Sequence, residues 1–145
     1  MMKIPLYKQE FSWSCLTTCI KMVLEYYGVK KTEKELRILF KTTPVFGTMW
    51  EFVESEVKRM GFKLVWKKFW NIQELESLIK QSIPLIAGIK REGEIHGHGV
   101  VVINISDNRV IAADPQIGDL IILYKEEFLE LWTERDNIAG YLTKV

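Results

Sequence analysis

Residues Gln9 to Gly28 read Q-E-F-S-W-S-C-L-T-T-C-I-K-M-V-L-E-Y-Y-G, and this stretch predicts an amphipathic helix. Its apolar side chains recur at the i, i+3, i+4 and i+7 spacing of one buried helix face: Leu16, Cys19, Ile20, Val23, Leu24 and Tyr27. Ser14 is a suitable N-cap, because its hydroxyl can accept from the free N–H groups of a first helical turn. Gly28 is a natural end point, since glycine readily adopts the left-handed conformation that ends helices.

Cys15 falls in the first turn of this predicted helix. The positive end of the helix dipole favours a thiolate there, and the thiolate is the nucleophilic form of cysteine. Cys15 is therefore a candidate nucleophile, whereas Cys19, one turn later on the apolar face, is expected to be a packing residue. Two cysteines four residues apart on one helix do not suit disulfide geometry, so we expect both to be reduced.

Length and composition indicate one globular domain spanning residues 1–145. The chain has 145 residues, of which 48% are hydrophobic and 27% charged, enough to bury a sizeable core. A net charge of +1 argues against nucleic-acid binding through bulk charge. The apolar runs are too short to cross a bilayer and the N-terminus has no hydrophobic signal core, so we expect a cytoplasmic protein. The oligomeric state stays open.

Helical patterns dominate the first half of the chain and strand patterns the second, which indicates an α+β fold with a mainly antiparallel sheet. Thr32-Glu35 and Thr48-Glu51 have the form of capping boxes, and Asn71 is a further N-cap. Besides the first helix, the expected helices cover 33–40, 49–60, 72–79 and 126–132. The expected strands cover 62–67, 83–89, 98–105, 109–114, 120–124 and 138–143.

A cysteine nucleophile requires a base, a group that orients the base, and donors for an oxyanion. His98 begins the strongest predicted strand and Asp114 ends the next one. A two-residue turn between these strands would put His98 and Asp114 on opposite faces. A three-residue loop, Ser106 to Asn108, would put them on one face at a diagonal that the two side chains can bridge. We therefore expect the longer turn.

The oxyanion donors would be the side-chain amide of Gln9, six residues before Cys15, and the backbone N–H of Cys15. His96, in the polar loop before His98, is expected to be an exposed loop histidine. Its spacing also permits it to be the base, since it lies two residues from His98.

These motifs in their order resemble the bacteriocin-processing cysteine peptidases. The resemblance lies in Q-x5-C followed by M-V-L-E-Y-Y-G, then G-H-G-V-V-V-I, and then A-D-P sixteen residues after His98. The best-known members are N-terminal peptidase domains of ABC exporters that cleave double-glycine leader peptides. The resemblance covers Gln9 to about Val145 and implies a papain-like fold.

By this resemblance Cys15 is the nucleophile, His98 the base, Asp114 the residue that orients it, and Gln9 the oxyanion residue. It implies hydrolysis of a peptide or isopeptide bond in a peptide or protein substrate, with no cofactor. The family usually has glycine directly after the nucleophile and often aspartate before it, whereas this chain has Leu16 and Ser14.

Two alternatives remain open. A side chain at position 16 could crowd the substrate backbone, which favours a domain of this fold that binds peptides without cleaving them. The second alternative is a Cys2His2 zinc site made of Cys15, Cys19, His96 and His98, because zinc accepts these ligands. Its C-x3-C and H-x-H spacings are unusual, and it would leave Gln9 and Asp114 without a role.

Overall fold

The computed structural model describes residues 1–145 and contains five helices and six strands. The helices are α1 (Cys15–Tyr26), α2 (Glu33–Leu39), α3 (Trp50–Arg59), α4 (Ile72–Lys80) and α5 (Lys125–Thr133). The strands are β1 (Phe62–Lys67), β2 (Leu85–Ile89), β3 (His98–Ile105), β4 (Arg109–Asp114), β5 (Asp119–Tyr124) and β6 (Ala139–Lys144). No helix is long and apolar enough to cross a membrane.

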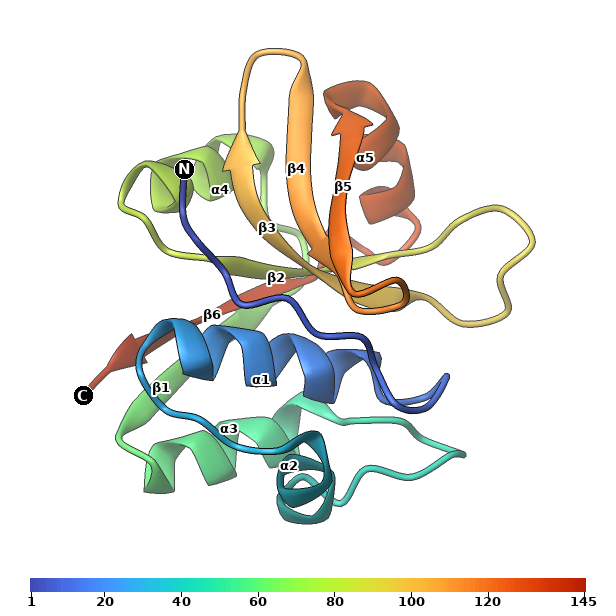
Figure 1. The fold of residues 1–145 in the computed structure, drawn as a ribbon. Helices are drawn as coiled ribbons and strands as arrows, with labels where there is room; N and C mark the ends of the chain where they lie inside the picture. The colour runs from blue at the N-terminus through green and yellow to red at the C-terminus, as the bar shows by residue number, and fades with distance from the viewer.

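The six strands form one sheet in the order β1-β6-β2-β3-β4-β5, and every neighbouring pair is antiparallel. Helices α1 to α3 lie on one side of this sheet, and α4 and α5 lie on the other (Figure 1). The predicted α+β class with an antiparallel sheet is confirmed.

Strand β3 supplies side chains to two hydrophobic cores because successive side chains of a strand point to opposite faces. Val101 and Ile103 belong to the core shared with α1, α2 and α3. Val100 and Val102 belong to the core beneath α4 and α5. A strand buried on both faces reads as an unbroken apolar run, as the sequence from residue 100 to 103 does.

The N-terminal residues 1–9 form no helix or strand and run along α1 toward its first residue (Figure 1). Ile4 is buried in the first core, and the Tyr7 hydroxyl donates to the Glu25 carboxylate at 2.7 Å. These two contacts hold the N-terminal segment against α1.

Two of the predicted helix caps are confirmed, the one at Thr48 is wrong, and Ser14 is the N-cap residue of α1 but lacks the expected side-chain hydrogen bond. Thr32 and Asn71 both form capping boxes. Thr48 does not, because α3 begins two residues later and the Thr48 hydroxyl lies 2.6 Å from that of Thr17. The Ser14 hydroxyl makes no cap bond to α1, because it accepts from the Phe11 N–H and so closes the preceding turn.

The β3–β4 connection differs from the predicted one. Ser106 and Arg109 face each other across a two-residue turn, and Lys125 donates to the carbonyl of the turn residue Asn108. The expected three-residue loop is therefore wrong. However, the register shifts by one residue between Val102 and Asn104, so that Val101 pairs with Ala113. This β-bulge gives the His98 end of the strand the register that the longer loop would have produced.

Candidate active site

Cys15 is the first residue of α1 and lines a cleft of about 710 Å³. His98, the first residue of β3, lines the same cleft. Three loop segments also line it: residues 12–13 before the helix, residues 44–48 between α2 and α3, and residues 93–97 before β3. Further wall residues are Trp50, Gly88, Arg135 and Ile138. The start of a helix and the start of a strand thus meet at one surface opening.

Burial of the Cys15 thiol opposes its ionisation in this conformation. Burial raises the pKa of Cys15, and the nearby Asp114 carboxylate adds to the rise. The backbone N–H groups of Gly99, Leu16 and Cys15 act in the opposite direction, but they do not outweigh burial. The nucleophilic role expected for Cys15 from its place at the helix start stays a prediction.

Cys19 lies one helical turn further on and is completely buried in the core shared with α1. Burial raises the pKa of its thiol well above the ordinary value. These facts agree with the packing role expected from its position on the apolar face.

His98 and Asp114 lie close together on β3 and β4. The His98 Nε2 atom is 3.8 Å from the Asp114 Oδ1 atom, and both side chains are 4% exposed. Arg91 lies beside both, with Nη1 3.1 Å from the His98 Nε2 and Nη2 3.8 Å from the Asp114 Oδ2. The bulge in β3 makes this approach possible, because it places the two residues on one face.

The Asp114 carboxylate has a lowered pKa. Burial alone would raise that pKa, but interaction with the His98 imidazole and a hydrogen bond from the Gln116 N–H more than compensate. The positive charge of Arg91 lowers it further. Asp114 is therefore ionised at neutral pH and can orient the imidazole.

The other imidazole nitrogen of His98 is held by Glu94. The His98 Nδ1 lies 3.2 Å from the Glu94 Oε2, and the Glu94 Oε1 accepts from the Arg91 N–H at 2.6 Å. No hydrogen bond joins the imidazole to the Cys15 thiol. Glu94 thus contacts the imidazole in the cleft that Cys15 also lines.

Gln9 is anchored beside Asp114. Its backbone N–H donates to the Pro115 carbonyl at 2.7 Å, directly after β4. Its side-chain Nε2 donates one N–H to the Phe11 carbonyl at 2.8 Å. An amide nitrogen has two N–H groups, and the second one makes no hydrogen bond within the protein, although Gln9 does not line the cleft. The Gln9 Oε1 is buried without a hydrogen-bond partner.

His96 lies in the loop that precedes β3 and is exposed, as expected. The zinc alternative finds no support, because no group of three or more histidine, cysteine, aspartate or glutamate side chains is arranged to hold a metal ion. Cys19 in particular is enclosed in the core, whereas His96 faces solvent.

Leu16 does not stand free in the cleft. Its side chain is 8% exposed and belongs to the core shared with α1, although the residue also lines the cleft wall. Most of the surface of this residue is therefore covered by neighbouring core residues.

Sequence reasoning missed Glu94 and Arg91. Both lie in an irregular segment with the polar, glycine-containing composition of a solvated loop, where periodicity gives no information. Glu94 and Arg91 precede His98 by four and seven residues, but such spacing brings side chains together only in a helix, so the sequence held no signal for them.

Comparison with solved structures identifies the class of fold. The peptidase domain of Streptococcus ComA, a bi-functional ABC transporter involved in quorum sensing, superposes with a TM-score of 0.82 at 24% identity over 100% of both chains. A double glycine motif protease from an AMS/PCAT transporter, solved in complex with the leader peptide, gives 0.80 at 21% identity over 99% of this chain and 94% of that one. A C39-like peptidase from Bacillus anthracis gives 0.79 at 17% identity over 100% and 96%.

The fold is thus that of the papain-like peptidase domains, as expected. The sequence matches the peptidase C39 family over residues 3–136, and the chain belongs to that family. A search of curated protein sequences found no match.

Proposed function

We propose that this protein is a cysteine peptidase that uses Cys15, His98, Asp114 and Gln9. Membership of the peptidase C39 family supports the class of activity. The observation that supports the residues is the pair formed by His98 and Asp114, 3.8 Å apart, in which His98 lines the same cleft as Cys15.

In the proposed reaction the Cys15 thiol transfers its proton to the His98 imidazole, and the sulfur attacks the carbonyl carbon of the scissile bond. Asp114 orients the imidazole and stabilises its positive charge. The imidazolium then gives the proton to the leaving amine as the C–N bond breaks. Water, deprotonated by the imidazole, hydrolyses the acyl-enzyme and restores the thiol.

The oxyanion of each tetrahedral intermediate would accept from the free N–H of the Gln9 amide and from the Cys15 N–H. Gln9 suits this role because its other amide N–H is bound to the Phe11 carbonyl, which restrains the side chain. Donors that are fixed before the reaction need no reorganisation when the negative charge develops.

The conformation described here is a resting state in this proposal. The His98 Nδ1 contacts Glu94 and the Cys15 thiol has a raised pKa, so proton transfer between them first requires the imidazole to leave Glu94. Glu94 lies in the wall of the cleft, where a bound substrate would contact it.

The substrate class is a peptide. One structural relative is described as a double glycine motif protease and was solved with a leader peptide, which makes peptides with a double-glycine motif the first ones to test. Exposed apolar side chains at the cleft rim, Val45, Phe46 and Ile95, offer contact surface for apolar residues of a peptide.

Peptide binding without cleavage is the second candidate function. The favouring observation is the engaged imidazole together with the raised pKa of Cys15, because a site in that state does not attack a carbonyl. This candidate predicts that peptides bind equally well to the wild type and to Cys15→Ala and that neither protein yields product.

The experiment is incubation of wild type, Cys15→Ala and His98→Ala with peptides that contain a double-glycine motif, with products identified by mass spectrometry. We expect one cleavage position with the wild type and no product with either variant. Equal product from Cys15→Ala would exclude the proposed nucleophile.

A further inference from the structure

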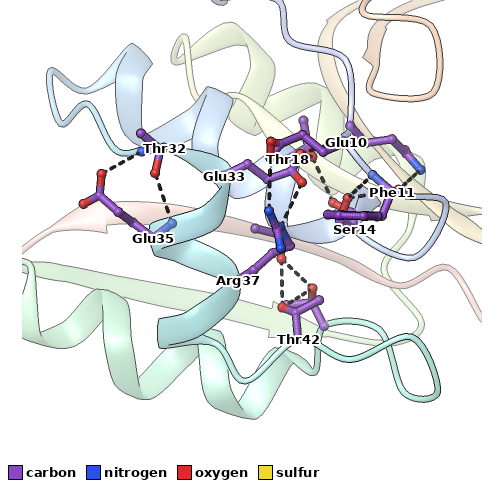
Figure 2. Close-up of polar contacts among 12 residues, drawn as sticks. Glu10, Phe11, Ser14, Thr18, Thr32, Glu33, Glu35, Arg37 and Thr42 are labelled. Carbon is purple, nitrogen blue, oxygen red and sulfur yellow. Dashed lines mark hydrogen bonds and ion pairs between the residues drawn. The ribbon is translucent and has the colours of Figure 1, made fainter.

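We propose that Glu33 and Arg37 of α2 are positioning residues that hold Gln9 in place for catalysis. This inference rests on the oxyanion role proposed for Gln9. Neither residue lines the cleft, and both act through the segment 9–14, which connects Gln9 to the start of α1 (Figure 2).

The Glu33 carboxylate joins three parts of the chain. It is 5% exposed and receives hydrogen bonds from the Glu10 N–H at 3.0 Å and from the Thr18 hydroxyl at 2.7 Å. Its second oxygen receives the Arg37 Nε at 3.1 Å. The carboxylate therefore connects α2 both to the residue after Gln9 and to the first turn of α1 (Figure 2).

Arg37 contacts the same segment through an ion pair with Glu10 and through the face of the Phe11 ring. Its Nη2 lies 3.1 Å from the Glu10 Oε1, and its guanidinium carbon lies 4.6 Å from the centre of the Phe11 ring. The Phe11 ring in turn stacks on Trp13 at 4.7 Å between ring centres. Arg37 thus restrains the two residues that directly follow Gln9.

Phe11 connects Arg37 to the Gln9 side chain through a hydrogen bond. Its carbonyl accepts from the Gln9 Nε2 at 2.8 Å and from the Ser14 hydroxyl at 3.0 Å. Ser14 precedes Cys15, so the network links the amide that would bind the oxyanion to the residue beside the nucleophile. A shift of Phe11 would move the Gln9 amide with it.

A carboxylate this deeply buried is unusual, because removal from water is unfavourable unless charged and polar partners compensate. Glu33 has three such donors, from Glu10, Thr18 and Arg37, and one of them belongs to the residue that directly follows Gln9. A helix needs no buried charge to pack on its neighbour. The arrangement therefore serves to fix the loop, and small displacements of a catalytic donor reduce rates strongly.

The chain contains a matched control on the same helix. Glu35, like Glu33, lies in the first turn of α2, but it is exposed and accepts only from the Thr32 N–H as part of the capping box (Figure 2). Glu35→Gln perturbs the start of α2 without touching residues 9–14, whereas Glu33→Gln keeps the shape of the side chain and removes its charge.

The test compares these two variants by amide hydrogen exchange and by peptide turnover. For Glu33→Gln we expect faster exchange in residues 9–14, a kcat about tenfold lower and an unchanged KM. For Glu35→Gln we expect wild-type values of all three. If Glu33→Gln folds poorly, Arg37→Lys provides the same test, because it keeps the charge and loses the contact of the planar guanidinium with the Phe11 ring.

A double-mutant cycle shows whether the effect passes through Gln9. Adding Glu33→Gln to Gln9→Ala should lower kcat by less than a further factor of two. A further tenfold loss in that background, or unchanged exchange in residues 9–14, would overturn the proposal. If Gln9→Ala itself leaves turnover unchanged while Glu33→Gln still loosens residues 9–14, the oxyanion role of Gln9 fails and the positioning role stands.

Discussion

The Nδ1 atom of His98 lies 3.2 Å from the Oε2 atom of Glu94, which binds the imidazole from the cleft side. The opposite nitrogen faces Asp114 at 3.8 Å. The imidazole therefore has a carboxylate on both sides and makes no hydrogen bond to the Cys15 thiol. The reactivity of that thiol should depend on whether Glu94 holds the imidazole.

Replacing Glu94 by alanine should increase the reactivity of Cys15 at neutral pH. The variant leaves the imidazole free to pair with the thiol. Because Glu94 is 24% exposed, solvent weakens its interaction with the imidazole, and we expect a gain of about three- to tenfold. The measurement is the rate of Cys15 alkylation by iodoacetamide at pH 7, read by mass spectrometry, with Cys19 as an internal reference.

The control for this prediction is the double variant Glu94→Ala/His98→Ala. It should alkylate no faster than the wild type, because the gain requires the imidazole. Equal gains with and without His98 would mean that Glu94 only restricts access to the cleft.

Replacing Asp114 by asparagine should remove stability in an acid-dependent manner. The folded protein lowers the pKa of this carboxyl below its ordinary value of 3.8, so its contribution is present above that pH and is lost as the pH falls through the folded-state pKa. At pH 7 we expect the variant to lose about 1–3 kcal/mol of unfolding free energy. Urea unfolding at pH 7 and pH 3 tests this prediction. The difference in unfolding free energy between the wild type and the variant should be smaller at pH 3.

The thiols should make the protein less stable at alkaline pH. Burial raises the pKa of both Cys15 and Cys19, so the unfolded chain ionises first, near its reference pKa of about 8.5. The stability that the neutral, buried thiols contribute is fully present below that pH and is lost as the pH rises toward the folded-state pKa values. Between pH 7 and pH 10, Cys15→Ser should lose less stability than the wild type; an identical loss in both proteins would contradict the assigned burial of Cys15.

The fold was largely predictable from sequence, because its elements have strong local signals. The apolar spacing of residues 16–27 predicts α1 to within a residue of its observed end, and Thr32 and Asn71 begin their helices as expected. The failures occur where tertiary contacts compete with local preference. Ser14 bonds to Phe11, and Thr48 bonds to Thr17.

The site was predictable only in part. Once the register of β3 and β4 is known, the alternation of side chains along a strand places His98 and Asp114 on the same face. That register depends on a β-bulge at Ile103, which the residues of the turn do not predict. Glu94 and Arg91 contact His98 from an irregular loop, whose sequence has no periodicity from which the contact could be predicted. The raised pKa of Cys15 arises from burial by distant segments, which a local rule about helix ends does not include.

Replacing Gln9 by alanine should leave the fold intact and remove most of the activity. The side chain makes one hydrogen bond, to the Phe11 carbonyl, so the loss of stability should be about 1 kcal/mol. Loss of an oxyanion donor lowers kcat on the order of 100-fold in other enzymes. Steady-state kinetics with a cleaved peptide, together with thermal unfolding, measures both effects, and unchanged turnover would remove Gln9 from the site.

Leu16 should matter more for stability than for turnover. It packs in the core with 8% exposure, so Leu16→Ala should reduce the unfolding free energy by about 2–4 kcal/mol. The kcat of the folded variant should stay within about threefold of the wild type, because most of the side chain is outside the cleft. A large increase in kcat would show instead that Leu16 obstructs the substrate backbone.

The most direct test of the central claim is the cleavage of a peptide library by the wild type and by Cys15→Ala under identical conditions, with new termini identified by mass spectrometry. The account predicts a defined set of new termini with the wild type and none with Cys15→Ala. The same termini from both proteins, or peptides that bind both proteins and stay intact, would contradict a peptidase with Cys15 as its nucleophile.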